Sequence, residues 1–132
     1  MRILKNKAFS KWAAKEGIGD NALRAAVEEM ARGLVEADLG GHVFKKRVAT
    51  VGRGKSGGAR TLLVYRVGDK AFFVYGFAKN IRANIKADEL DGLKKLAKEL
   101  LGYTARQLEQ AIIGGALIEV NGDEEDNPGR GT

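Results

Sequence analysis

Two β-rich runs separated by two turn-forming residues constrain the fold more than any other feature of this chain. Residues 60–67 and 70–77 are rich in Val, Leu, Phe and Tyr, and Gly68 and Asp69 stand between them. Two such residues between β-rich runs are a strong signal for a β-hairpin. The sequence therefore predicts a pair of adjacent antiparallel strands near the middle of the chain.

Side-chain alternation sorts the residues of this hairpin between two faces of the sheet. A two-residue turn would place Leu63 opposite Val74 and Leu62 opposite Tyr75. One face, expected to pack beneath helices, would then hold Leu63, Tyr65, Phe72 and Val74. Arg60 and Tyr75 would share the other face.

The remaining apolar residues predict helices and short strands on both sides of the hairpin. We expect helices at 7–16, 21–37, 89–101 and 104–113, and further strands at 2–5, 42–50 and 116–120. The predicted fold class is α+β: a small antiparallel β-sheet with two N-terminal helices and one or two C-terminal helices. Residues 1–120 would form one domain, and the glycine-rich, acidic residues 121–132 a disordered tail.

Positive charge is concentrated in the segment that is predicted to form the sheet. Residues 42–86 contain eleven Lys and Arg side chains and one Asp, although the net charge of the whole chain is only +6. A strongly basic sheet attracts polyanions, and RNA or DNA is the first candidate. The alternative is an ordinary solvated surface.

Composition excludes several kinds of chemistry. The chain has no Cys, so disulfides, Cys nucleophiles and Cys-bound metals are excluded, and its single histidine, His42, makes a His-based metal site improbable. We expect no metal and no cofactor. There is neither a signal-peptide pattern nor an apolar run long enough to span a bilayer, so we expect a cytoplasmic protein with no membrane partner.

Several basic and aromatic residues are candidates for binding and cleaving RNA. The basic loop predicted at 51–59 would offer Arg53 and Lys55 to phosphates. Its Gly54-Lys55-Ser56 sequence resembles the end of an NTP-binding loop, but Ala49 replaces the required glycine and a strand follows instead of a helix. The loop therefore favours RNA over a nucleoside triphosphate.

The other candidates lie on or beside the predicted strands. Arg60 could clamp a phosphate from a rigid strand, and Tyr75 could stack on a base. A lysine crowded by other cations has a lowered pKa, which makes Lys46 a candidate general base. Further basic or polar residues fall within or directly after predicted strands, namely Lys45, Arg47, Lys79, Asn80 and Arg82. Strand alternation separates Lys46 from Lys45 and Arg47.

Three segments together resemble a known family. They are 39–48 (LGGHVFKKRV), 54–66 (GKSGGARTLLVYR) and 72–80 (FFVYGFAKN). The chain resembles the RelE/ParE superfamily of type II toxin–antitoxin toxins, in the RelE-like branch often called HigB. The resemblance covers about residues 3–102, and the order of elements predicted above agrees with that family's fold.

The resemblance implies a toxin that inhibits translation by cutting mRNA in the ribosome. It implies a neighbouring antitoxin as partner, with operator DNA bound only through that antitoxin. The matching basic positions are Lys55, Arg60 and Lys79, with Arg82 as a further phosphate ligand. Family sites also use a tyrosine or a histidine, and Tyr75 and His42 are both open for that role.

The leading hypothesis is a metal-independent endoribonuclease with Lys55, Arg60, Lys79, Tyr75 and Lys46 as catalytic residues. Lys46 or Lys79 would be the base, and Arg60 and Lys55 would stabilise charge on the phosphorus. Lys45, Arg47, Arg53, Arg82 and Asn80 would bind RNA. Two alternatives remain: a ParE-like toxin that inhibits gyrase without cutting nucleic acid, and a non-enzymatic RNA-binding module.

Overall fold

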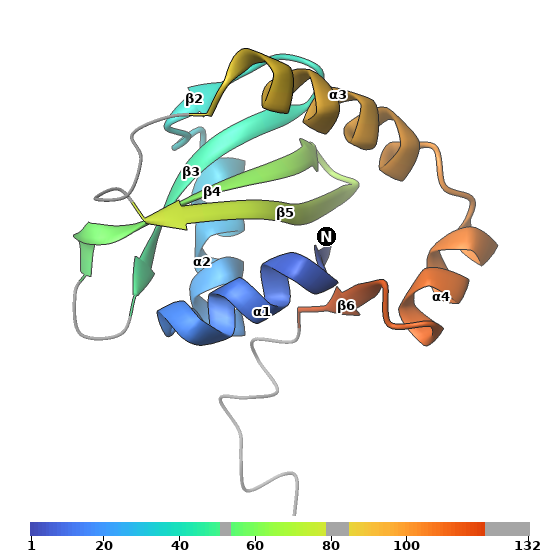
Figure 1. Ribbon diagram of the computed structural model, residues 1–132, viewed down its shortest axis with the longest axis horizontal. Coiled ribbons are helices and arrows are strands. Elements are labelled where there is room, and N and C mark those ends of the chain that lie inside the picture. The colour runs from blue at the N-terminus through green and yellow to red at the C-terminus, as the bar shows by residue number, and fades with distance from the viewer. Residues whose placement is uncertain (51–53, 79–84, 121–132) are drawn as a thin grey trace, which may run out of the picture.

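The predicted hairpin lies at the centre of a sheet that has helices on both faces (Figure 1). The structure is a computed structural model that describes residues 1–50, 54–78 and 85–120, and for 54–58 it describes the backbone only. The elements are β1 (Arg2–Asn6), α1 (Lys7–Glu16), α2 (Asp20–Ala31), β2 (Ala37–Asp38), β3 (Val43–Thr50), β4 (Gly54–Arg66), β5 (Lys70–Ala78), α3 (Ala87–Leu101), α4 (Ala105–Ile113) and β6 (Leu117–Glu119). The predicted α+β class is confirmed.

The sheet is mixed, because one of its strand pairs is parallel. The order of its strands is β2-β3-β4-β5-β1-β6, and every neighbouring pair is antiparallel except β1 with β5. The strand expected at 2–5 therefore lies inside the sheet between β5 and β6, and not at an edge. Chain order alone did not reveal the parallel pair, since about sixty residues separate its two strands.

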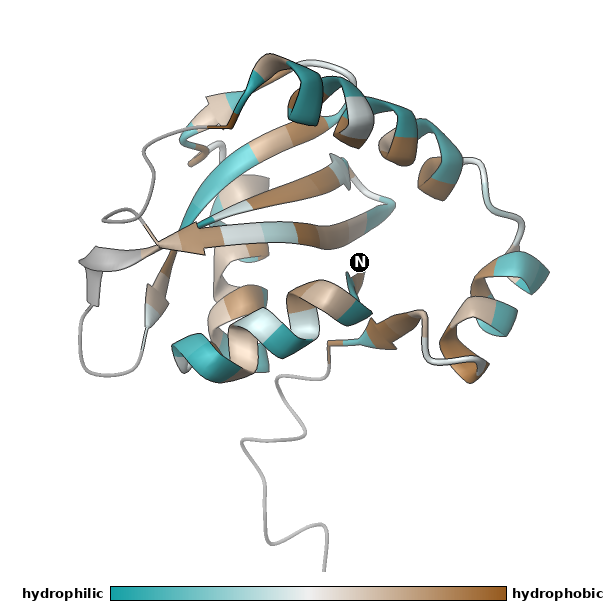
Figure 2. Cartoon of the chain, in the orientation of Figure 1, coloured by the Kyte–Doolittle hydropathy of each residue, from teal (hydrophilic) through white to brown (hydrophobic). Residues whose placement is uncertain are grey.

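Two hydrophobic cores hold the helices to the sheet (Figure 2). The first joins α1 and α2 to one face, and its fully buried side chains include Phe9, Leu23, Leu63 and Phe73. The second joins α3 and α4 to the opposite face through a set that includes Leu4, Val64, Phe72, Ala97 and Leu108. Because both faces are covered, β4 and β5 are apolar almost throughout and do not alternate with polar residues.

The second helix is shorter than predicted. α2 ends at Ala31, because Gly33 adopts a left-handed conformation with φ of 89°. A glycine in this conformation ends many helices, and here the N–H of Leu34 bonds back to the carbonyl of Glu29 at 3.0 Å. The residues that follow leave the helix and form β2, which pairs with β3 and was not predicted.

The hairpin between β4 and β5 differs from the predicted register at its turn. Arg66 pairs with Lys70, so the loop has three residues and not the predicted two. Further along the strands, an irregularity between Leu62 and Leu63 shifts the register by one residue. As a result, Leu62 pairs with Tyr75 as predicted. One strand thus carries an extra residue relative to its partner, as in a β-bulge. This shift places Phe72 and Val74 in the second core, beneath α3 and α4, whereas Leu63 and Tyr65 belong to the first core on the other face of the sheet. The prediction that these four side chains share one face was therefore wrong.

The connections around the hairpin are also shorter than predicted. β4 already begins at Gly54, which pairs with Thr50, so residues 54–59 of the loop expected at 51–59 are strand. α3 begins at Ala87, and the Lys86 N–H donates to the Glu89 carboxylate at 2.9 Å. Thr104 and Gln107, whose spacing in the sequence is typical of a capping box, form one at the start of α4, where a helix was expected. The tail predicted at 121–132 lies outside the described residues.

Candidate nucleic-acid interface

Basic side chains from neighbouring strands gather on the α3 face of the sheet. Lys45 pairs with Leu62, which pairs with Tyr75, and these three form one row across β3, β4 and β5. Arg47, Arg60 and Phe77 form the next row. Residues paired across strands share a face, so we call Lys45, Arg47, Arg60 and Tyr75 the basic cluster. Arg60 and Tyr75 therefore share a face, as predicted.

Arg60 is more enclosed than the sequence suggested. The residue is only 4% exposed, whereas a side chain with an open guanidinium group was expected. Its Nε donates to the Glu36 carboxylate at 3.1 Å from Oε2 and lies 3.0 Å from Oε1. Its Nη1 is buried and has no hydrogen-bond partner among the described residues. An unpaired donor of a buried cation is costly, so this nitrogen is a candidate to receive an anion.

Glu36 adds a carboxylate to the cluster that sequence reasoning missed. Besides Arg60, it faces Lys45, whose Nζ lies 3.7 Å from Glu36 Oε2. The backbone fixes this position, because the Glu36 N–H donates to the Lys45 carbonyl at 3.1 Å. The sequence prediction placed Glu36 inside a helix; the glycine at position 33 was the available signal that the helix ends earlier.

Lys46, which the sequence offers as a candidate general base, lies on the opposite face of the sheet from the basic cluster. Alternation turns its side chain toward α2, where it lies 2.7 Å from Glu29 Oε1 and donates to the Leu34 carbonyl at 2.8 Å. It is buried, with 6% of its surface exposed. Lys46 therefore links β3 to α2 and to the residues that follow this helix. It also contributes to a hollow of about 270 Å³ at the sheet edge.

The structure leaves five of the predicted site residues untested. Four of them, Arg53, Lys79, Asn80 and Arg82, lie outside the described residues. The backbone of Lys55 belongs to β4, next to the pairing of Gly54 with Thr50, but its side chain is not described. Their roles remain predictions.

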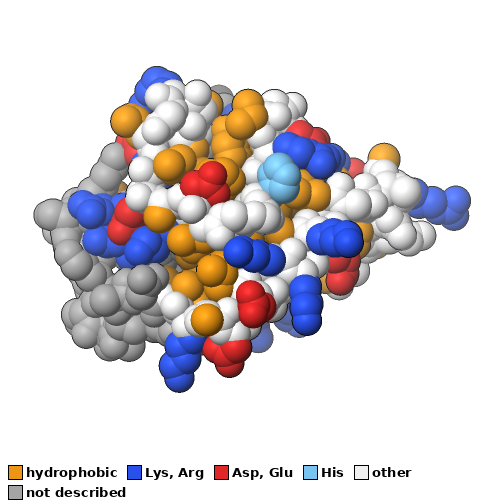
Figure 3. Space-filling view, turned by 90° about the horizontal axis from the view of Figure 1, so that it is seen from above, with side chains coloured by type: hydrophobic (Ala, Val, Ile, Leu, Met, Phe, Trp, Pro, Cys, Tyr) orange, Lys and Arg blue, Asp and Glu red, His pale blue; other side chains and the backbone are white. Residues whose placement is uncertain are grey.

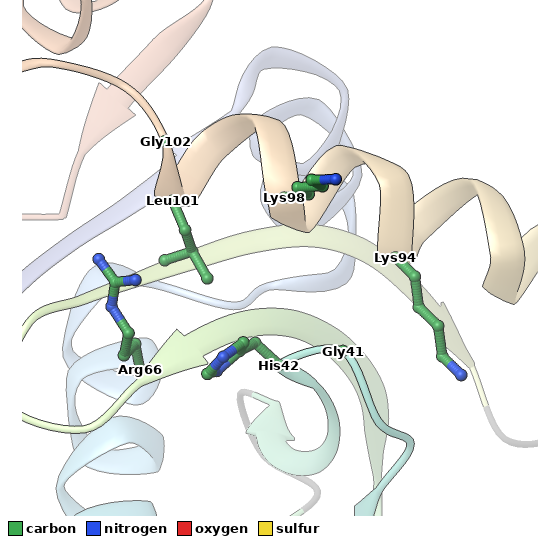
Figure 4. Close-up of a pocket in the computed structure, with 7 residues that line it drawn as sticks. All are labelled: Gly41, His42, Arg66, Lys94, Lys98, Leu101 and Gly102. Atoms are coloured by element: carbon green, nitrogen blue, oxygen red, sulfur yellow. The ribbon is translucent and has the colours of Figure 1, made fainter.

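His42 lies at the other end of the sheet, beside a second basic hollow (Figure 4). It precedes β3, has φ of 66°, and its Nδ1 is 3.4 Å from the Tyr65 carbonyl. The hollow measures about 440 Å³ and is lined by Gly41, His42, Arg66, Lys94, Lys98, Leu101 and Gly102. The charged ends of its Lys and Arg side chains point in different directions, and Arg66 is paired with Asp69. His42 is thus not part of the basic cluster.

Two further properties of the described residues bear on the kind of site. Among residues 1–50, 54–78 and 85–120, no group of three or more His, Asp and Glu side chains is placed to hold a metal ion. No helix in the same ranges is long and apolar enough to cross a membrane.

The mixed sheet has one pair of helices on each face and a basic cluster on the α3 face, an arrangement that agrees with a RelE-like fold. A family model described as the RelE toxin of the RelE / RelB toxin–antitoxin system matches residues 1–120. The chain belongs to this family, and it is therefore a toxin of a type II toxin–antitoxin system. No curated protein matches its sequence. Membership implies a RelB-type antitoxin as partner, whereas the narrower HigB assignment remains a prediction.

Proposed function

We propose that the chain is a metal-independent endoribonuclease that cleaves mRNA, in association with the ribosome, and so inhibits translation. The observation that carries this proposal is the basic cluster, in which three cations and a tyrosine from three adjacent strands share one face with the Glu36 carboxylate. Cations on rigid strands are suited to hold a phosphodiester and to stabilise the charge that develops during its cleavage.

The reaction needs a proton acceptor, electrostatic stabilisation and a proton donor. The RNA 2′-oxygen attacks the adjacent phosphorus, the bond from phosphorus to the 5′-oxygen breaks, and a 2′,3′-cyclic phosphate and a 5′-hydroxyl remain. In place of Lys46, we assign Glu36 as the acceptor of the 2′-hydroxyl proton, because it is the carboxylate beside Arg60 and Lys45. The leaving 5′-oxygen takes up a proton, and Lys79 and Tyr75 are the proposed donors.

Arg60 would act in two ways. Its Nε holds Glu36 in place, and its positive charge, largely shielded from water, acts strongly on a nearby phosphorane. Lys45 and Arg47, which are only partly buried, would contact phosphates directly. Lys55, Arg53, Asn80 and Arg82 would extend this contact, as the sequence predicts. Cytoplasmic location and contact with operator DNA only through the antitoxin belong to the same proposal.

Replacing Arg60 tests the proposal directly. We expect Arg60→Ala to reduce mRNA cleavage by about 10²–10³-fold, the usual loss when one transition-state donor is removed. Arg60→Lys keeps the charge but loses the planar fork, and we expect only partial recovery. Primer extension on mRNA, after induction of each variant without antitoxin, would map the cuts.

Antitoxin affinity and folding are the controls for this experiment. Antitoxin affinity should be retained by Arg60→Ala if the arginine serves the reaction. The variant should be less stable, because Glu36 loses its partner, so its cleavage is compared per folded molecule. Uncut mRNA in cells that express the wild-type toxin, together with a DNA-damage response, would instead favour gyrase inhibition. Salt-sensitive RNA binding without cleavage would reduce the protein to a binding module.

A further inference from the structure

The hollow beside His42, which we call the His42 hollow, takes no part in the proposed reaction. His42 precedes Arg47, the strand partner of Arg60, by five residues. Five residues of extended chain span about 17 Å, at about 3.4 Å per residue. A ligand in the His42 hollow therefore need not touch Arg60, and the hollow is a surface separate from the reaction centre.

One wall of the His42 hollow is the last part of α3. Lys94, Lys98 and Leu101 follow one another at spacings of four and three residues, so they share one face of the helix. This face lies beside the buried Ala97 and Leu100, which belong to the second core. Packing against the sheet thus fixes the position of this wall.

The opposite wall is the turn that precedes β3. Gly40, Gly41 and His42 all have positive φ, with values of 87°, 60° and 66°. The turn is held by the Val43 N–H, which donates to the Gly40 carbonyl at 3.0 Å, and by the Tyr65 N–H, which donates to the His42 carbonyl at 2.9 Å. The wall is therefore formed before any ligand binds, which lowers the cost of ordering it.

The methylene stem of Lys94 lies across this turn and narrows the hollow. A β-carbon added to Gly41 would be 3.0 Å from Lys94 Cγ, and one added to Gly40 would be 3.3 Å from Lys94 Nζ. The stem therefore contributes apolar surface to the lining, and the ammonium group lies at the rim.

The cationic groups surround the His42 hollow and do not converge on its centre. Figure 4 shows the charged ends of Arg66, Lys94 and Lys98 pointing in different directions. Arg66 is paired with Asp69, whereas Lys94 and Lys98 form no ion pair with a carboxylate of residues 1–50, 54–78 and 85–120. A phosphate is held best by donors that converge on its oxygens. This arrangement is therefore poorly suited to a single phosphate group.

Between these charges the lining of the hollow is largely apolar. It includes Leu101, the stems of the two lysines and two glycines. Seen from the α3 side, hydrophobic side chains reach the surface beside the single histidine, with Lys and Arg side chains around them (Figure 3). A volume of about 440 Å³ is within the range that encloses a ligand group. An apolar centre with a charged rim is typical of protein–protein contacts.

We propose that the His42 hollow is a docking site for an acidic, amphipathic segment of the antitoxin. An apolar side chain of that segment would fill the hollow, and Asp or Glu residues on either side of it would pair with Lys94 and Lys98. Charge complementarity carries this choice, because the two lysines have no carboxylate partner in the described chain and family membership implies a protein partner. The inference rests on that membership and not on RNA cleavage.

The acidic residues of the chain itself fit the rim of the hollow but not its centre. They are Asp123, Glu124, Glu125 and Asp126, and residues 121–132 contain no large apolar side chain. Such a segment would pair with the lysines but leave the apolar lining uncovered. A separate partner with an apolar anchor therefore fits better.

Charge reversal at the rim tests the inference. The probe is the antitoxin encoded beside the toxin gene, and isothermal titration calorimetry at low and high salt measures its affinity. We expect Lys94→Glu and Lys98→Glu each to weaken binding about tenfold at low salt and less at high salt. Lys95→Glu makes the same charge change on exposed α3 surface outside the hollow, and it should bind as the wild type does.

A second variant tests the apolar centre of the hollow. We expect Leu101→Ala to weaken antitoxin binding on the order of tenfold, with the salt dependence of the wild type, because an apolar contact is lost. Thermal unfolding would confirm that each variant is folded. Each should also arrest growth when it is induced without antitoxin.

A charge exchange across the interface would identify the partner residue. An Asp→Lys or Glu→Lys substitution in the antitoxin should restore binding to the Lys98→Glu toxin and weaken binding to the wild type. Antitoxin affinity that both lysine variants leave unchanged, or that Lys95→Glu lowers equally, would overturn the docking site.

Other occupants of the hollow would give different results. Weaker binding of a 2′-O-methyl RNA strand by the lysine variants, with antitoxin affinity unchanged, would assign the hollow to nucleic acid. Loss of self-association, with antitoxin affinity unchanged, would assign it to a second copy of the chain. Both results would overturn the inference. Uncut mRNA in cells would count only against the proposed function, because calorimetry detects docking without any reaction.

Discussion

At the scale of single residues, two neighbouring lysines of one strand illustrate how position decides function. Lys45 and Lys46 differ only in the direction that the strand gives their side chains. Lys45 faces Glu36 and the basic cluster, whereas Lys46 faces α2 and is paired with Glu29. The sequence predicted that alternation separates them, but it did not predict which of the two would have its charge buried.

Exchanging these lysines for alanine should give opposite phenotypes. We expect Lys46→Ala to lower the free energy of unfolding by about 1–3 kcal/mol, because Glu29 and the Leu34 carbonyl lose their partner, with cleavage per folded molecule unchanged. Lys45→Ala should change stability little and reduce cleavage on the order of 10²-fold. Urea denaturation and primer extension would measure the two effects, and identical phenotypes would contradict the assignment of faces.

At the scale of elements, the sequence predicted more about the existence of each helix and strand than about its ends and register. Thr104 and Gln107 located the start of α4, because a capping box depends on residues three positions apart. The irregularity at Leu62 and Leu63 could not be predicted, because it depends on how two strands fit between helix layers. The same shift explains why Phe72 was assigned to the wrong face.

Gly76 shows how one element can depend on the absence of a side chain. Trp12 of α1 lies across it, so that an added β-carbon would be 2.1 Å from Cζ3 of the indole ring. We expect Gly76→Ala to lower stability by about 1–3 kcal/mol, as overpacking does. Thermal unfolding would measure this, and Gly92→Ala is the matched control, since the same methyl group in open space on α3 should raise the midpoint. A Gly76→Ala protein as stable as the wild type would show that Trp12 can move aside.

At the scale of the whole molecule, the basic cluster could be predicted in part because charge and alternation are local properties. Strand periodicity alone placed Lys45 with Arg47 on one face of their strand, and Arg60 with Tyr75 on one face of the hairpin. That these two faces coincide follows from the register of β3 with β4. Glu36 could not, because its place beside Arg60 depends on where α2 ends and on the backbone bond to Lys45. The enclosure of Arg60 likewise depends on the complete tertiary structure.

Arg2 and Glu119 join the strands formed by the two ends of the described chain. Arg2 Nε donates to Glu119 Oε2 at 2.6 Å, which holds the pKa of this carboxyl below its ordinary value. A lowered pKa in the folded state means that the pair stabilises the protein above the ordinary carboxyl pKa and that this stability is lost as the pH falls through the folded value. Both side chains are about one third exposed, so the effect should be below about 1 kcal/mol.

Glu119→Gln tests this link through its dependence on pH. We expect the variant to be slightly less stable than the wild type at pH 7, with the difference vanishing in acid once the wild-type carboxyl is protonated. Urea denaturation of both proteins across the acid range would measure it. A difference that persists or grows in acid would mean that the carboxylate charge is not the cause.

The parallel contact of β1 with β5 has a consequence for synthesis on the ribosome. β1 comprises residues 2–6, yet its neighbours in the sheet begin at Lys70 and Leu117. Contacts between such distant segments form slowly, and the first strand must wait for both partners to be translated. A nascent chain would therefore remain incompletely folded until nearly all of the described residues have been translated.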